Sequence, residues 1–426
     1  MTDATSLPAS DAAAVEAAAV PHDADAARQA KPVVFLGVFA CYLGMTVILP
    51  IVSPLVRELG LSESQGGWMV SIGAVAVALA STGWGRWSDR VGRRPVILAG
   101  FAGLAASYAV FTASALAGLS GVLAGTALFA ALVAGRALVG AFVPAVPTAA
   151  QAYMADVTDA AGRSGGMALI GAANGMAMVL GPALGGLLLL GGLMWPLYAA
   201  TLLPLASLVL VTALLRRTAP RPAAVPERLP PWRAGLWPWL LVGLAVMTAI
   251  VTLQINAGFF LQDRLGLTAL ATARTLAVAL TLTGLALLVV QALQMRLRWP
   301  AVRLVAVGLP VLVAGVVALL LAGASPWGCY AAFVLIGLGA GLILPGYMAG
   351  ASLAVSETLQ GSVAGLASAV QGAGMIVAPV VTTRLYEIDA ALPFWLIVAV
   401  LAVALVVWAG ALRIRPARGG DADGHP

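Results

Sequence analysis

Long apolar runs separated by short polar stretches dominate this chain of 426 residues. An α-helix of about 20 residues crosses the roughly 30 Å hydrocarbon core of a membrane, and the runs recur at about that length. They are too long, and alternate too little, for the strands of a membrane β-barrel. The pattern therefore predicts twelve transmembrane helices, with expected bounds of 33–54, 66–86, 96–117, 122–150, 165–190, 193–214, 236–258, 269–293, 302–323, 327–349, 362–383 and 391–412.

The residue content agrees with a membrane protein and argues against several other classes. Hydrophobic residues make up 61% of the chain and charged residues 9%, whereas soluble domains are about half apolar and about a quarter charged. Cys41 and Cys329 lie in or beside apolar runs without a CxxC motif, and His22 and His425 lie in the tails. The chain also lacks the GxxxxGK[ST] loop of ATP-driven pumps. We therefore expect no metal, no other cofactor and no enzymatic activity.

The basic residues predict the orientation of the helices, because cytoplasmic loops accumulate Lys and Arg. With the N-terminus inside, eighteen of the 23 basic residues fall on the cytoplasmic side, four fall outside, and Arg136 lies within a helix. The outer four are Arg57, Arg264, Arg274 and Arg384. Both termini are therefore expected in the cytoplasm, in a bacterial-type inner membrane. The sequence pI of about 9.8 reflects this asymmetry and requires no nucleic-acid partner.

A polar stretch with five arginines and five prolines divides six predicted helices from six. Many transporters consist of two such duplicated halves. An offset of 197 residues pairs Asn174 with Gln371 and Met178 with Met375, which places the fifth predicted helix over the eleventh. The expected organisation is a disordered cytoplasmic tail (1–32), a first six-helix bundle (33–214), a cytoplasmic linker (215–235), a second six-helix bundle (236–412) and a cytoplasmic tail (413–426).

The stretch GRWSDRVGRRP, between the second and third predicted helices, concentrates charge in a chain that has little of it. It resembles the cytoplasmic loop motif of the major facilitator superfamily, and the matching residues are Gly85, Asp89, Arg90, Gly92, Arg93 and Arg94. The resemblance covers about residues 33–412 and implies two pseudo-symmetric bundles of six helices. It also implies that Asp89 docks near residues 361–365, at the N-terminus of the eleventh helix, where the helix dipole favours an anion. That contact would latch the cytoplasmic side shut; the alternative is that the arginines act only as topology signals.

A second feature of the family is an arginine inside the fourth predicted helix, here Arg136 in RALVG. An arginine in hydrocarbon costs at least about 2.5 to 3.5 kcal/mol unless it faces a polar cavity or a partner, so it is a functional candidate. The resemblance to proton-coupled relatives implies a coupling site there. A lone cation in the cavity would also favour an anionic or zwitterionic ligand. The alternative is that the side chain snorkels to the outer interface.

The fifth predicted helix carries GPALGG, which resembles the motif of antiporters in the superfamily. The match is incomplete, because Ala168 and Ala177 stand where the motif has two further glycines. The proline would kink the helix and the glycines would admit a neighbouring helix, so close packing is the alternative explanation. The four matching residues are Gly181, Pro182, Gly185 and Gly186.

Charged residues near the helix ends are the remaining candidates for coupling and gating. No acidic residue lies in the middle of a predicted helix, although proton-driven exporters generally need a carboxylate within reach of the cavity. Glu58 and Asp263, at outer helix ends, are the candidate proton carriers. Asp156 and Arg163, between the fourth and fifth predicted helices, form either an inner gate or a solvated pair.

The resemblance implies a central cavity lined mainly by the first, fourth, seventh and tenth helices. Scattered amides and hydroxyls among aliphatic side chains suit a bulky amphipathic ligand that is held by shape and a few hydrogen bonds. About half of the candidate side chains are expected to bond between helices instead. The candidates are Tyr42, Thr46, Asn174, Gln254, Asn256, Phe259, Tyr347 and Gln371.

These features predict a secondary transporter that acts as a monomer and resembles the drug–proton antiporter branch of the superfamily. It is expected to export a small amphipathic organic molecule, either a drug or a secreted metabolite such as a siderophore, by alternating access and proton antiport. The proton gradient is the expected energy source. The alternatives are a proton-coupled symporter that imports a sugar or an organic acid, and a membrane sensor that transports nothing.

Overall fold

The computed structural model describes residues 24–158, 160–215, 235–356 and 359–413, and their side chains over 31–158, 165–215, 235–356 and 359–411. The described residues form helices and no strand. Twelve stretches among them are long and apolar enough to cross a membrane, which confirms the predicted all-α fold with twelve spans.

Ten spans are single helices, and several extend beyond the bounds that hydropathy predicts because charged residues continue the helix at its ends. They are α4 (Glu63–Val91), α5 (Arg93–Leu119), α8 (Ala160–Leu188), α9 (Trp195–Leu214), α10 (Trp237–Leu265), α11 (Ala269–Leu297), α12 (Ala301–Leu321), α13 (Pro326–Leu353), α14 (Gln360–Ile388) and α15 (Leu392–Arg413).

Two spans are interrupted, which hydropathy does not reveal. The first span consists of α2 (Ala24–Thr46), a 3-10 turn η1 (Leu49–Ile51) and α3 (Val52–Glu58), and the fourth consists of α6 (Gly125–Phe142) and α7 (Ala145–Val157). Pro50 and Pro144 lie at the two breaks, where proline supplies no backbone N–H. Because α2 begins at Ala24, part of the tail predicted over 1–32 is helical.

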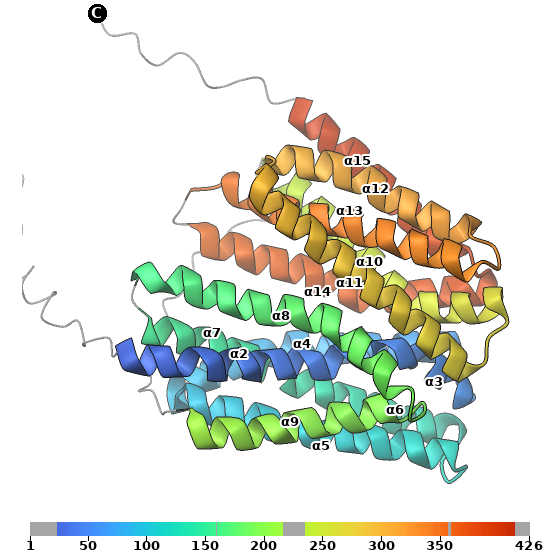
Figure 1. Cartoon of the computed structure of the whole chain (residues 1–426), viewed down its shortest axis with the longest axis horizontal. Coiled ribbons are helices and arrows are strands. Elements are labelled where there is room, and N and C mark those ends of the chain that lie inside the picture. The colour runs from blue at the N-terminus through green and yellow to red at the C-terminus, as the bar shows by residue number, and fades with distance from the viewer. Residues whose placement is uncertain (1–23, 159, 216–234, 357–358, 414–426) are drawn as a thin grey trace, which may run out of the picture.

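The two sets of six spans form two halves that pack side by side. The first half (blue to green) occupies the lower part of Figure 1 and the second half (yellow to red) the upper part. Across the boundary, α4 packs on α14, α8 on α11, and α3 on α10. We call the end of the bundle where α3 ends and α4 begins the outer end, and the opposite end the inner end. The outer end is the one predicted to face away from the cytoplasm.

The halves approach most closely toward the outer end, where glycines face the opposite half. A Cβ atom on Gly67 of α4 would overlap the side chain of Thr383 in α14 and lie 2.6 Å from the Pro379 carbonyl. A Cβ atom on Gly284 of α11 would lie 2.9 Å from the side chain of Val179 in α8. The helix backbones therefore meet here with almost no side chain between them.

The same helices separate toward the inner end. Added Cβ atoms on Gly171 and Gly175 of α8, and on Gly361 and Gly365 of α14, would meet nothing within 4 Å. The hydrogen bonds that Ser53, Arg57, Ser64 and Arg274 make across the boundary all lie in the outer part. In this conformation the halves are joined at the outer end and apart at the inner end.

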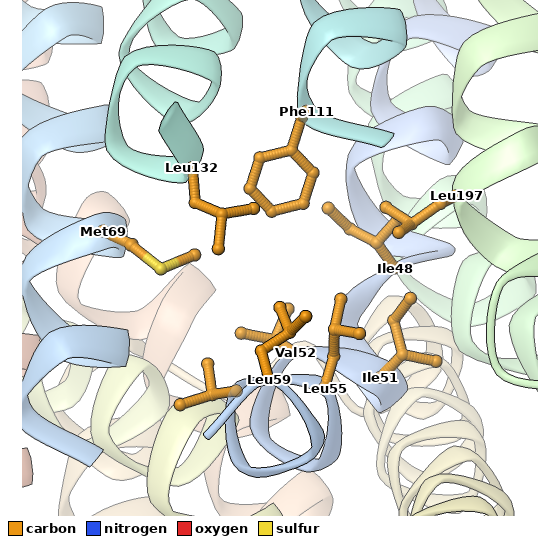
Figure 2. A pocket seen from close by; sticks show the side chains of 10 residues that line it. Ile48, Ile51, Val52, Leu55, Leu59, Met69, Phe111, Leu132 and Leu197 are labelled. Carbon is orange, nitrogen blue, oxygen red and sulfur yellow. The ribbon is translucent and has the colours of Figure 1, made fainter. Parts of the chain in front are cut away.

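An apolar void lies beside α3, within the first half. Figure 2 shows Leu55 of α3 and Leu59, directly after it, on one side, and Met69, Phe111 and Leu132 from α4, α5 and α6 on the other. The void is small, with a volume of about 20 Å³. The segment that ends the first span therefore leaves a small apolar gap against its own half.

We expect Gly140→Ala to destabilise the first half, because the new methyl group would overlap the Gly73 carbonyl where α6 crosses α4. Overpacking of this kind costs about 1–3 kcal/mol. Gly83→Ala in α4 is the matched control, since its methyl group would meet nothing within 4 Å. Thermal unfolding of the purified proteins tests the difference. Equal unfolding temperatures would show that α4 and α6 do not pack as described.

Candidate functional site

A cavity with a volume of about 80 Å³ lies between the two halves. Its walls come from α2 and α8 of the first half and from α10, α11 and α13 of the second. Most of the lining side chains are aliphatic, Phe333 adds an aromatic ring, and no charged residue is among them. The polar members are Thr46, Gln254 and Thr283.

Gln254 is the polar side chain of this cavity that is most available to a ligand. Thr46 already donates to the carbonyl oxygens of Tyr42 and Ala177, at 2.9 and 2.8 Å. Thr283 is within 3.0 Å of carbonyl oxygens of its own helix and of α13. The amide of Gln254 has no hydrogen bond to any side chain or backbone group of the described residues and is half-buried. It therefore offers both a donor and an acceptor to a ligand in an apolar site.

The structure divides the predicted cavity residues into lining and structural groups. Thr46 and Gln254 line the cavity, as predicted. Asn256 does not: it is buried and donates to Thr382 at 2.9 Å, joining α10 to α14. Tyr347 and Gln371 bond to each other, so this pair also joins two helices. The remaining three, Tyr42, Asn174 and Phe259, lie outside the lining of this cavity.

The residues of the GPALGG motif bring α8 close to helices of both halves. A Cβ atom on Gly181 would overlap the Thr46 side chain, and one on Gly185 would lie 2.5 Å from the Val47 carbonyl, both in the first span. A Cβ atom on Gly186 would lie 2.9 Å from Ala277 of α11. Pro182, between them, lines the cavity. These glycines therefore admit neighbouring helices, which was the alternative explanation for the motif. Antiport stays a prediction.

An ion-pair network closes the outer end across the two halves. Arg57 of α3 contacts Glu63 of α4 at 2.7 Å and both carboxylate oxygens of Asp263 in α10, at 2.5 and 2.9 Å. The Tyr386 hydroxyl of α14 donates to the same Asp263 carboxylate at 2.6 Å. The Arg57 guanidinium also lies 5.2 Å from the ring centre of Phe259. We call Arg57, Glu63, Asp263 and Tyr386 the outer network.

The outer network joins two residues that lie far apart in the sequence, Arg57 and Asp263. In the sequence Arg57 is only one of four basic residues predicted outside. No local motif identifies its ion pair, because the partner Asp263 is 206 positions away. Asp263, a candidate proton carrier, already has Arg57 and Tyr386 as partners in this conformation. Glu58, the other candidate, is exposed and forms no ion pair with a described residue.

At the inner end, Arg93 holds two carboxylates of the first half together. Its side chain is buried and lies 2.5 Å from Asp89 and 2.9 Å from Asp156. Asp156 is therefore paired with Arg93. The side chain of Arg163 lies outside the described residues, so its pairing with Asp156 stays a prediction. Asp89 does not reach the N-terminal part of α14 here, because the inner ends of the halves are apart. Its docking there stays a prediction for the opposite conformation.

Arg136 lies inside the first half and is not among the residues that line the cavity described above. It is half-buried, and a Cβ atom on Gly73 of α4 would lie 3.1 Å from its side chain. The nearby Tyr108 of α5 has a buried hydroxyl with no hydrogen-bond partner among the described residues. Arg136 thus lies apart from this cavity in this conformation, and a coupling or anion-binding role for Arg136 stays a prediction.

Comparison with known proteins identifies the family. The sequence profile of the Major Facilitator Superfamily matches residues 34–379. The chain belongs to this superfamily. It is 28% identical over 365 residues to the tetracycline resistance protein, class C, of Escherichia coli, a match that covers 82% of this chain and 87% of the relative. It is also 28% identical over 181 residues to multidrug resistance protein 2 of Bacillus subtilis, covering 42% of each.

Solved structures of major facilitator proteins share the fold. The human organic anion transporter MFSD10 (TETRAN) superposes with a TM-score of 0.64 at 22% identity and covers 90% of this chain and 99% of its own. A bacterial homolog of the human lysosomal transporter Spinster, in an inward-facing and occupied conformation, gives a TM-score of 0.70 at 15% identity, covering 93% and 98%. The architecture of the chain is thus that of a major facilitator transporter.

We expect Asp263→Asn to loosen the outer end, because it removes the anion that Arg57 contacts across the boundary. The side chain of Asp263 is 44% exposed, so the expected loss is modest, about 0.6–1.4 kcal/mol, or about three- to tenfold in the open population. The measurement is the rate at which a membrane-impermeant maleimide labels Thr383→Cys, a buried position opposite Gly67. Cys41 and Cys329, both buried, are replaced in this background.

Asp389→Asn is the matched control for this labelling experiment. It makes the same chemical change at the same end, but Asp389 accepts only from the backbone of its own loop, at Ala391. The control should label at the unmodified rate. If Asp263→Asn also labelled at that rate, the outer network would not hold the halves together.

Proposed function

We propose that the protein exports a small amphipathic organic molecule across a bacterial-type inner membrane by proton antiport. The observation that carries this proposal is the cavity between the halves, which is apolar, contains one free amide at Gln254 and has no charged lining residue. Such a lining suits an amphipathic ligand that is held by apolar contacts and a few hydrogen bonds. Sugars and other strongly hydrated solutes need dense polar contacts, so uptake of such a solute is less well supported.

The relatives support export of a drug-like molecule. The match to a tetracycline resistance protein extends over most of both chains, and a second relative is a multidrug resistance protein. The structural neighbour MFSD10 is an organic anion transporter, which keeps anionic ligands among the candidates. Since Arg136 is not in the lining of the cavity, we assign no preferred charge to the ligand and leave that choice to the panel of compounds below.

We propose an alternating-access cycle in which this conformation receives the ligand from the inner end. The outer network and the glycine contacts between α4 and α14 keep the ligand from leaving outward. Closure of the inner end would bring Asp89 to the N-terminal part of α14, while the outer network separates. Because Asp263 already accepts bonds from Arg57 and Tyr386 here, we assign it to this gate and retain Glu58 and Arg136 as candidates for proton coupling.

The proposal is tested by proton movement in energised inside-out vesicles that contain a pH-sensitive dye. A panel of tetracyclines, cationic drugs and anionic metabolites is added in turn. We expect dye recovery with at least one class, and loss of that recovery in Arg136→Ala. If no compound moved protons while the protein was present in the membrane, proton antiport of these classes would be excluded.

We expect Gln254→Leu to raise the half-saturating concentration of a transported compound about two- to tenfold. The substitution removes one neutral hydrogen bond, typically worth about 0.5–1.5 kcal/mol, and keeps the volume of the site. Gln291→Leu, an amide of α11 outside this cavity, is the control and should leave that concentration unchanged. Equal values for Gln254→Leu and the unmodified protein, with every compound of the panel, would exclude Gln254 from the binding site.

We expect Asp89→Asn to abolish most transport while the protein still inserts and unfolds at nearly the same temperature. Arg93 keeps Asp156 as a partner in this variant, so the buried guanidinium is not left without an anion. Vesicle transport and thermal unfolding are measured on the same preparation. Transport at the unmodified rate would rule out the latch at Asp89.

A further inference from the structure

A second hollow lies on the seam between α8 and α11, on the outside of the bundle. Its volume is about 460 Å³, and it is more open to its surroundings than the cavity between the halves. Pro182 and Leu187 of α8 and Val278 and Leu282 of α11 are among its walls. Figure 1 shows these two helices meeting toward the end at which α3 lies.

The walls of this groove are apolar and face outward from membrane-spanning helices. Leu187 is 62% exposed, Leu190 71% and Val278 46%, although all three belong to α8, α11 or the turn between α8 and α9. In a membrane the neighbours of such side chains are lipid acyl chains, since water is absent at that depth. A groove among them is filled by an acyl chain.

Arg274 stands at the outer end of the same groove. It lies near the start of α11, is exposed, and donates to the carbonyl oxygen of Leu189 at 3.0 Å. A guanidinium has five N–H donors, so donors remain for a further acceptor. No described carboxylate forms an ion pair with Arg274, in contrast to Arg57 at the same end of the bundle.

The distance between the Arg274 charge and the far end of the apolar wall fits the head group and upper acyl chain of a phospholipid. From Arg274 to Leu282 the rise along α11 is about 12 Å, at about 1.5 Å for each residue. This places a cation at the level of the head groups and an apolar trough along one side of the outer half of the hydrocarbon. A phosphate group bonds well to arginine. In a zwitterionic lipid such as phosphatidylcholine the choline cation offsets the phosphate charge beside Arg274, and a free anion would pair with Arg274 without filling the trough.

We propose that this groove binds one anionic phospholipid of the outer leaflet, with its phosphate at Arg274 and an acyl chain along Val278 and Leu282. One wall belongs to each half, so the complete groove exists only while α8 and α11 lie together. The bound lipid therefore stabilises the conformation that is closed at the outer end. Binding follows from the fold alone, whereas this effect on the conformation rests on the alternating access proposed above.

The binding test compares retention of phosphatidylglycerol and phosphatidylcholine with the same acyl chains, measured by native mass spectrometry of the purified full chain. We expect retention of one phosphatidylglycerol at about five- to tenfold lower lipid concentration than phosphatidylcholine. Arg274→Gln should remove the preference, and Val278→Trp, which fills the trough at an exposed position, should weaken both lipids. Arg384→Gln changes an exposed arginine at the same end that lies outside the groove, and it should keep the preference.

Three results would overturn the lipid site. The first is equal retention of both lipids by the unmodified protein, and the second is an unchanged preference in Arg274→Gln. The third is displacement of phosphatidylglycerol by millimolar inorganic phosphate, which would make Arg274 a site for free anions. Each of these results is independent of whether any compound is transported.

The conformational effect is read from maleimide labelling of Thr383→Cys in vesicles. Labelling should be about three- to tenfold slower in phosphatidylglycerol than in phosphatidylcholine, and the difference should vanish in Arg274→Gln. If phosphatidylglycerol is retained but labelling is equal in the two lipids, the binding site stands and its coupling to the outer end is refuted.

Discussion

The contact between Arg57 and Asp263 joins the two halves of the molecule where the cavity between them must be sealed. Arg57 belongs to the last turn of a short helix in the first half, and Asp263 to the end of α10 in the second. The guanidinium contacts both oxygens of Asp263 and also Glu63, so a single side chain ties α3, α4 and α10 together. The halves are thus held together at the outer end by residues from three helices.

The rest of the outer junction is built so that it can separate. Gly67 and Gly284 let helix backbones approach without interlocking side chains, and the ion pairs of the outer network are partly exposed. Interlocked side chains would have to leave their rotamers before the halves could part. Partly exposed ion pairs contribute little stability, which suits a junction that separates in the proposed alternating-access cycle.

The sequence predicts the features that depend on local residue content, and the structure supplies those that depend on pairing between distant helices. Twelve spans and the superfamily follow from hydropathy and from the GRWSDRVGRRP motif. Gln254 and Asn256 are two positions apart on one helix and look alike in sequence, yet one lines the cavity and the other bonds to Thr382. Only the neighbouring helix decides between them, because two residues turn a helix by about 200°.

Ion pairs between residues that are distant in the sequence cannot be predicted from it for the same reason. The proposed pairing of Asp156 with Arg163 uses residues that are close in the chain, whereas the observed partner, Arg93, comes from a different helix. Arg136 lies inside a membrane-spanning helix, as the sequence predicts, and its side chain packs beside Gly73 of the same half. The motif glycines of α8 are recognisable in the sequence, but only the structure shows that they contact both the first span and α11.

The apolar void beside α3 affects how the end of the first span can rearrange. Leu55 and Leu59 face empty space on the inner side of the segment that carries Arg57. A void of about 20 Å³ removes some of the dispersion contacts that would otherwise fix these two side chains. In the proposed alternating-access cycle, this gap lets Leu55 and Leu59 repack inside the first half when Arg57 separates from Asp263.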